Sequence, residues 1–165
     1  MEILRYLCIN SPVGPLVLGM SESGLAVLAF GHRLPATLGG RRVNWQESSA
    51  ACRDVQQQLD EYFAGRRREF TMPLDLRGTD FQRECWEQLL SIPYGETRSY
   101  GDIARAVGRP NAYRAVGQSN HHNPLAIVVP CHRVLAGGKA LGGYGGGLPT
   151  RHFCCVWKAL PFATS

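Results

Sequence analysis

The last 63 residues of this sequence lack acidic side chains: residues 103–165 contain seven lysines and arginines but no aspartate or glutamate. Residues 1–102 hold 11 basic and 13 acidic residues, so the net charge of +5 arises from the second part of the chain. A region without carboxylates can lie against a polyanion, because nothing in it repels phosphate groups. The charge distribution therefore favours a nucleic-acid partner.

Long hydrophobic runs are also missing. No apolar stretch approaches the roughly 18 residues that cross a bilayer. The N-terminus carries Glu2 rather than a basic segment followed by an apolar one, so it does not match a secretion signal. We therefore expect a cytoplasmic protein with no membrane partner. Its hydrophobic fraction of 44% is that of a globular chain able to bury a core.

The six cysteines include no CxxC pair, which argues against a thiolate zinc site. Without a secretion signal, we expect the thiols to be reduced. His121, His122, Cys131 and His132 could be arranged into a metal site, but their spacing fits no common pattern. The glycine-dense last third has no phosphate-binding fingerprint such as GxGxxG. We expect neither a metal ion nor a cofactor.

Hydrophobic periodicity and turn residues predict an α+β fold in two domains. Residues 1–76 are expected to form an N-terminal antiparallel sheet with a helix, and residues 77–165 a mostly helical C-terminal domain. The expected strands cover residues 2–9, 15–21, 25–30 and 70–76, and the expected helices cover residues 48–63, 80–90, 99–107 and 111–119. Thr79-x-x-Gln82 and Ser99-x-x-Asp102 are capping-box patterns that open two of these helices.

The last two expected helices are short and are separated by Gly108-Arg109-Pro110. Two short helices joined by a glycine-containing turn form a helix-turn-helix pattern, here at about residues 99–120. Many helical pairs share this pattern and bind nothing. Combined with the charge distribution, the pattern favours nucleic-acid binding.

The strongest chemical signal is the run Ile127-Val128-Val129-Pro130-Cys131-His132-Arg133-Val134-Leu135. An apolar segment ends at a proline, and a thiol, an imidazole and a guanidinium follow on consecutive residues. Only a thiolate is a strong nucleophile at neutral pH, and imidazole or cationic neighbours favour the thiolate. The run indicates a cysteine that is alkylated or acylated, while a buried structural cysteine remains the alternative at this point.

Further motifs surround that run with consistent order and gaps. They are Tyr94-Gly95-Glu96-Thr97-x-Ser99-Tyr100-Gly101, Arg114-Ala115-Val116-Gly117, Asn123-Pro124, Pro130-Cys131-His132-Arg133-Val134 and Gly143-Tyr144-x-Gly146-Gly147-Leu148. Together they resemble the O6-alkylguanine-DNA alkyltransferases of the bacterial type. The strand-rich start and the expected helix that ends near residue 63 are also similar, so the resemblance covers nearly the whole chain.

The resemblance implies a single-turnover DNA repair protein, a methylated-DNA–protein-cysteine methyltransferase. An alkyl group would move from O6 of a flipped guanine, or from O4 of a thymine, to Cys131. His132 would remove the thiol proton through water. Asn123 would tie the loop before the nucleophile to the helix-turn-helix, and the Tyr100 hydroxyl would help to neutralise the departing base. The implied partner is double-stranded DNA containing O6-alkylguanine, bound by a monomer, with cooperative assembly on DNA left open.

The resemblance also implies which residues contact DNA and the flipped base. The DNA-binding set is Arg114, Ala115, Gly117, Ser99 and Tyr113, and the guanine-pocket set is Val134, Tyr144 and Gly145. Arg114 matches the finger that enters the base stack in place of the flipped base. Tyr113 departs from the family, in which a small residue is common beside that arginine.

The C-terminus departs most from the family, whose last helix carries a glutamate that hydrogen-bonds the catalytic histidine. Alignment without gaps from Cys131 places Lys158 at that position, and no acidic residue follows Asp102. An ammonium near His132 opposes formation of the imidazolium, so we expect alkyl transfer to persist but to be slower. Two alternatives stay open: the ammonium could instead stabilise the thiolate directly, or Glu84 or Glu87 could supply the carboxylate. The main alternative is a protein that binds alkylated bases with weakened or no transfer. A transcription regulator is a third, weaker hypothesis.

Overall fold

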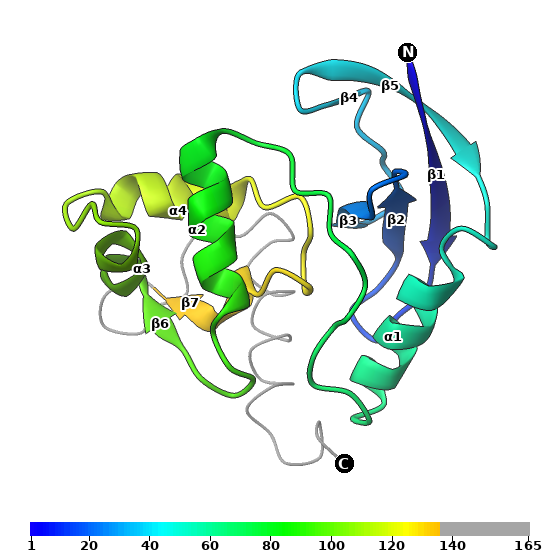
Figure 1. The fold of residues 1–165 in the computed structure, drawn as a ribbon. Helices are drawn as coiled ribbons and strands as arrows, with labels where there is room; N and C mark the ends of the chain where they lie inside the picture. Colours follow the sequence, from blue (N-terminus) through cyan, green and yellow to red (C-terminus); the bar gives the residue numbers. More distant parts are fainter. Residues whose placement is uncertain (136–165) are drawn as a thin grey trace.

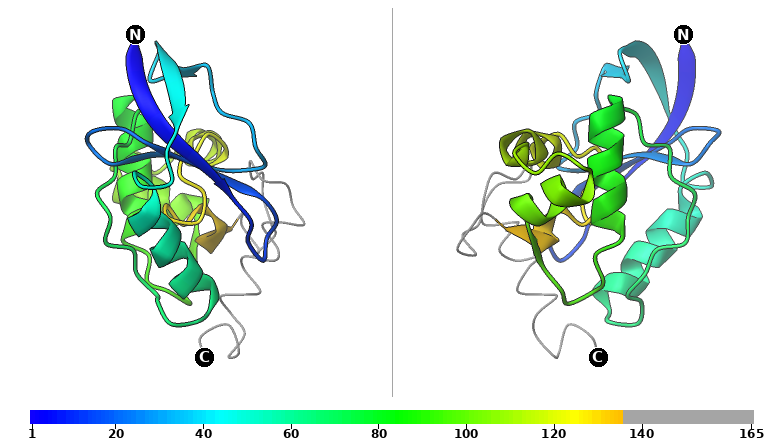
Figure 2. Two further views of the ribbon diagram at one scale, coloured as in Figure 1. Left: turned by 90° about the vertical axis from the view of Figure 1, so that its right-hand side faces the viewer. Right: turned by 60° about the vertical axis from the view of Figure 1, so that its left-hand side comes forward.

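The structure is a computed structural model that describes residues 1–135 of the chain. A five-stranded sheet and helix α1 form one side of the molecule, and helices α2, α3 and α4 form the other (Figure 1). In the right-hand view of Figure 2, the green α2 lies in front and the turquoise α1 lies to its right. The strands are β1 (Glu2–Ile9), β2 (Leu16–Met20), β3 (Leu25–Phe30), β4 (Thr37–Leu38), β5 (Arg41–Glu47), β6 (Arg98–Ser99) and β7 (Val134–Leu135). The helices are α1 (Arg53–Phe63), α2 (Asp80–Leu90), α3 (Tyr100–Ala106) and α4 (Tyr113–His121).

The sheet has the strand order β3-β2-β1-β5-β4. The strands β1, β2 and β3 pair antiparallel as predicted, but β1 and β5 run parallel, so the sheet is mixed rather than antiparallel throughout. No strand was expected at β4 or β5. Of its seven residues β5 buries only Val43, so the alternation of apolar and polar residues that marks a strand is weak there.

The strand predicted at residues 70–76 is wrong. Only an isolated bridge joins Leu74 to Leu25 of β3, with hydrogen bonds from the Leu25 N–H to the Pro73 carbonyl (2.9 Å) and from the Asp75 N–H to the Leu25 carbonyl (2.8 Å). Pro73 has no N–H to donate and cannot continue a ladder. The segment instead connects α1 to α2 along the β3 edge of the sheet.

Both predicted capping boxes are confirmed at the starts of α2 and α3. Thr79 Oγ1 accepts from the Gln82 N–H at 3.2 Å, and Gln82 Oε1 accepts from the Thr79 N–H at 2.9 Å. Ser99 and Asp102 form the equivalent pair at 3.0 and 2.9 Å. Within residues 1–135, no helix is long and apolar enough to span a bilayer.

The hydrophobic core is continuous between the two sides of the molecule. Trp86 of α2 is 1% exposed, and its indole N–H donates to the Ser119 carbonyl of α4 at 2.8 Å. From the sheet, the Leu28 N–H donates to the Pro124 carbonyl (2.8 Å) and the Leu28 carbonyl accepts from the Ala126 N–H (2.9 Å). The loop that follows α4 is therefore attached to strand β3.

Arg77 joins the start of β1 to the segment that connects α1 to α2. Its two terminal nitrogens donate to the two carboxylate oxygens of Glu2, each at 2.7 Å, and Nη2 also donates to Asp75 at 2.8 Å. These bonds hold the pKa of Glu2 below its usual value. Burial raises the pKa of Asp75, but hydrogen bonds from Arg77 and Ser21 outweigh it, so that pKa is also lowered.

Candidate functional site

The segment that carries Cys131 is a buried loop between α4 and β7. Cys131 opens a single 3₁₀ turn, Cys131–Arg133, with hydrogen bonds from the Cys131 N–H to the Val129 carbonyl (2.8 Å) and from the Arg133 N–H to the Pro130 carbonyl (2.9 Å). Cys131 and His132 are each 1% exposed. The thiol and the imidazole are therefore fixed inside the protein, and a reacting group has to be brought to them.

Asn123 fixes the shape of this loop from within. Its Nδ2 donates to the Val129 carbonyl at 2.8 Å, and its Oδ1 accepts from the Leu125 N–H at 2.9 Å. Between those contacts Ile127 has a φ of 72°, in the left-handed region that a β-branched residue rarely adopts. Such strain costs ~1–3 kcal/mol and persists only where the surroundings enforce it. The Asn123 contacts and the backbone bonds to Leu28 enforce it here.

A short parallel ladder between β6 and β7 brings the start of α3 to the loop (Figure 1). The paired residues are Arg98 with Val134 and Ser99 with Leu135. Tyr100 follows directly, and a Cβ atom on Gly117 of α4 would lie 3.5 Å from Tyr100 Cε2. The aromatic ring therefore packs against α4, while its backbone lies next to the strand that follows Cys131.

Within residues 1–135, two other thiols are buried in the core, those of Cys52 and Cys85. Burial raises the pKa of Cys52 to about 11, and burial also raises the pKa of Cys85. Both thiols are therefore protonated at neutral pH and are poor nucleophiles.

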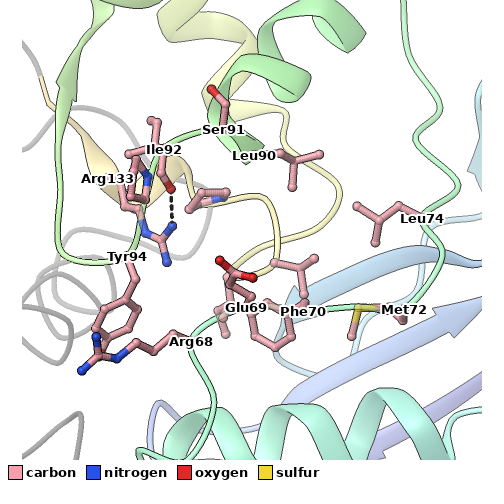
Figure 3. A pocket seen from close by; sticks show the side chains of 14 residues that line it. Arg68, Glu69, Phe70, Met72, Leu74, Leu90, Ser91, Ile92, Tyr94 and Arg133 are labelled. Carbon is pink, nitrogen blue, oxygen red and sulfur yellow. Dashed lines mark hydrogen bonds between the residues drawn. The ribbon is translucent and has the colours of Figure 1, made fainter.

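Arg133 was not predicted as a site residue, yet it anchors the chain just after Cys131. Its Nη1 donates to the Ile92 carbonyl at 2.6 Å, and its guanidinium lies 5.7 Å from the ring centroid of Tyr94 (Figure 3). Arg68 lies 5.2 Å from the same ring. Burial lowers the pKa of Arg133 and raises that of Tyr94. The partner of Arg133 is a backbone carbonyl, so no pattern of residue types in the sequence marked it as an anchor.

A cavity of about 500 Å³ lies beside this anchor, between the connection after α1 and the loop after α2. Met72 and Leu74 line one end of it, and Arg133 and Tyr94 line the other (Figure 3). Pro130 borders the cavity, but Cys131 is not among its lining residues. The cavity therefore adjoins the nucleophile loop without opening onto the thiol.

The exposed face of α4 borders a second, more open hollow of about 490 Å³. Its lining residues are Tyr100, Tyr113, Arg114, Gly117, Gln118 and His121. On the opposite face of the helix, Val116, Ser119 and Asn120 are buried. Helix α4 is thus held by one face, and its other face borders the hollow.

The predicted DNA-binding residues are distributed unevenly over this surface. Tyr113, Arg114 and Gly117 line the hollow. Ala115 is exposed on α4 but does not line it, and the Ser99 hydroxyl accepts the cap bond of α3. Three further predicted positions, Tyr144, Gly145 and Lys158, lie outside the described residues. In the part of the chain that the structure describes, no three His, Cys, Asp or Glu side chains are grouped so that they could hold a metal ion.

Comparison with known proteins matches almost the whole chain to one family. Residues 4–76 match the 6-O-methylguanine DNA methyltransferase, ribonuclease-like domain, and residues 80–155 match the 6-O-methylguanine DNA methyltransferase, DNA binding domain.

Individual relatives agree with this match. The methylated-DNA–protein-cysteine methyltransferase of Mycobacterium tuberculosis (strain ATCC 25618 / H37Rv) is 50% identical over 146 residues, which are 88% of this chain and 87% of the relative. The protein of the same name from Methanosarcina barkeri is 43% identical over 154 residues, 91% and 94% of the two chains. A crystal structure of Mycobacterium tuberculosis OGT in complex with DNA has a TM-score of 0.85 and 46% identity, with 94% of this chain and 92% of that chain covered. By sequence and by fold, the chain belongs to the 6-O-methylguanine DNA methyltransferase family.

Proposed function

We propose that the chain repairs alkylated DNA in a single turnover, with Cys131 as the acceptor. The Cys131 sulfur forms a bond to the alkyl carbon as the bond from that carbon to O6 of guanine, or to O4 of thymine, breaks. The proton lost by the thiol is balanced by a proton gained by the departing base. The resulting thioether is not reversed, so one protein molecule repairs one lesion. The observation that carries this proposal is the buried Cys131–His132 pair on a loop held by Asn123.

The same arrangement suggests how the neighbouring residues act. His132 takes the thiol proton through a water molecule, and the Tyr100 hydroxyl stabilises charge on the departing base. Val134, together with Tyr144 and Gly145, holds the guanine. Because Cys131 is 1% exposed, a base stacked within a duplex cannot reach the sulfur. The target nucleotide has to be extruded from the helix before it reacts.

We assign DNA binding to α3 and α4 as a helix-turn-helix. Supporting this, α4 presents Tyr113, Arg114 and Gly117 on an exposed face of a region that lacks acidic residues. We propose that Ala115 and Ser99 contact DNA at the margin of the same surface. Extruding a base costs a few kcal/mol, and a stacked Arg114 guanidinium offsets part of that cost.

A protein that binds alkylated bases without transfer is the alternative, and it has less support. The chain retains the cysteine, and relatives at 43% and 50% identity are named as methyltransferases. We also propose a division into domains at residues 76 and 77 and a cytoplasmic location.

Transfer from a duplex whose O6-methylguanine carries a radiolabelled methyl group tests the proposal. Label is expected to appear on the protein, with guanine restored in the DNA. Cys131→Ser is expected to take up no label, whereas the control Cys8→Ser, at an exposed cysteine of β1, is expected to react like the wild type. Tight binding of the duplex with no label on the wild-type protein would support the binding-only alternative.

A further inference from the structure

Tyr113 exposes an aromatic ring on the surface assigned to DNA. It is the first residue of α4 and is 48% exposed, one of only a few large hydrophobic side chains in residues 1–135 with that much exposure. The buried contacts of α4 are made by Val116, Ser119 and Asn120 instead. This ring is exposed in a region of the sequence that is basic and lacks carboxylates, so it is available for contact with a polyanionic partner.

The ring stands beside the guanidinium of Arg114, which also lines the hollow on α4. The Arg114 guanidinium carbon lies 5.9 Å from the Tyr113 ring centroid, within cation–π distance. Both groups border the hollow of about 490 Å³, with Tyr100 and Gly117 as further neighbours. Two flat groups, a phenol ring and a guanidinium, are therefore presented together at the start of one helix.

We infer that Tyr113 stacks on a nucleobase when the lesion is extruded, as a second flat surface next to Arg114. The inference rests on the proposed contact of α4 with DNA and assigns a role at that contact. Extrusion uncovers base faces on both sides of the gap, and covering them offsets the cost of unstacking. An aromatic ring stacks on any base, because every base has a π-face. Its contribution depends on ring area rather than on charge.

Equilibrium binding separates this role from an electrostatic one. In a Cys131→Ser background, which removes the covalent step, binding to a duplex containing O6-methylguanine is measured at several salt concentrations. Tyr113→Ala is expected to weaken binding about 10-fold or more without changing the slope of log K against log salt concentration. Tyr113→Phe is expected to bind like its parent, because the ring is kept. Arg114→Ala is expected to make the slope shallower, because it removes a positive charge from the contact as well as a flat group.

Two control measurements test whether Tyr113→Ala weakens binding indirectly, by disturbing the protein rather than by removing the ring. Ile3→Ala removes another exposed apolar side chain, 49% exposed on β1, and is expected to leave binding unchanged. With Cys131 intact, Tyr113→Ala is expected to react with the free base O6-methylguanine at the wild-type rate, since a free base needs no extrusion.

The inference is overturned if Tyr113→Ala binds the lesion duplex as tightly as its parent. It is also overturned if Tyr113→Phe loses as much affinity as Tyr113→Ala, or if the free-base reaction slows. A wild-type protein that takes up no methyl group while Tyr113→Ala still loses affinity would contradict the proposed function and support the stacking role.

Discussion

The described thiols differ in what surrounds them. Burial raises the pKa of Cys52, to about 11, and of Cys85, so both remain protonated at neutral pH. Cys131 is equally buried but is followed by His132 and lies on a loop whose backbone is strained at Ile127. Imidazole beside a thiol is the arrangement that activates cysteine nucleophiles. The surroundings, rather than exposure, distinguish the proposed acceptor.

Lys158 provides a prediction at the residue scale. The alignment assigns Lys158 to the position of the family's glutamate, where an ammonium would oppose formation of the His132 imidazolium. Lys158→Glu is therefore expected to raise the single-turnover rate about 10-fold or more. The rate is measured with an O6-methylguanine duplex under excess protein. Arg66→Glu, at an exposed arginine, makes the same change in charge and serves as the control. An unchanged rate in Lys158→Glu would show that this side chain does not act on His132.

At the scale of elements, one amide connects the end of α4 to the nucleophile loop. Asn123 satisfies the Val129 carbonyl and the Leu125 N–H, while Leu28 of β3 holds the same loop from the sheet. The sheet is thereby part of the support of the site. A loop held from both sides can keep Ile127 in an unfavourable conformation and Cys131 in a fixed position.

Asn123→Ala tests this support. Leaving the buried Val129 carbonyl without its partner is expected to lower the free energy of unfolding by ~1–3 kcal/mol. The rate of alkyl transfer is expected to fall as well, because the thiol loses its fixed position. Urea unfolding and single-turnover transfer are the two measurements. Asn44→Ala, at an exposed asparagine of β5, should change neither, and a fully stable Asn123→Ala would argue against the tie.

Local signals predicted the elements that depend on local chemistry. Thr79 and Ser99 begin helices because their hydroxyls accept from the N–H groups of Gln82 and Asp102. The strand at residues 70–76 failed because Pro73 interrupts it, and β5 was missed because its pairing with β1 joins distant parts of the chain. A parallel partner leaves no short-range pattern in the sequence.

The site residues also fall into two groups: those that motifs in the sequence identify and those whose role depends on the folded backbone. Cys131, His132 and Asn123 could be named from motifs, since their types and spacing are characteristic of one family. The roles of Leu28 and Arg133 depend on backbone carbonyls and N–H groups brought together by folding. A carbonyl is the same in every residue, so such contacts leave no trace in residue type.

At the scale of the whole molecule, Arg77 connects the first strand to the segment between the two sides. Its hydrogen bonds lower the pKa of Glu2, and together with Ser21 they lower that of Asp75 against the effect of burial. Carboxyl groups with lowered pKa in the folded state bind fewer protons there than in the unfolded state. Their stabilising effect is therefore complete above the ordinary values of 4.5 and 3.8 and is lost as the pH falls through the lowered values.

Arg77→Gln is accordingly expected to be less stable than the wild type at neutral pH, by more than the ~0–1 kcal/mol of a surface ion pair. The difference is expected to shrink as the pH falls below about 4, because the wild type loses the same interactions. Urea unfolding across this pH range gives both quantities. Arg83→Gln, which removes an exposed ion pair with Asp80, is the control and should have little effect at any pH. A constant difference between Arg77→Gln and wild type would contradict the linkage.

The identity of the acceptor is tested most directly by intact-mass spectrometry and peptide mapping after mixing the protein with excess DNA containing O6-methylguanine. We predict a gain of one methyl group per molecule, located on the peptide that contains Cys131. Cys52 and Cys85 are predicted to remain unmodified. A methyl group on another residue, or no gain in mass while the protein binds the duplex, would contradict the account.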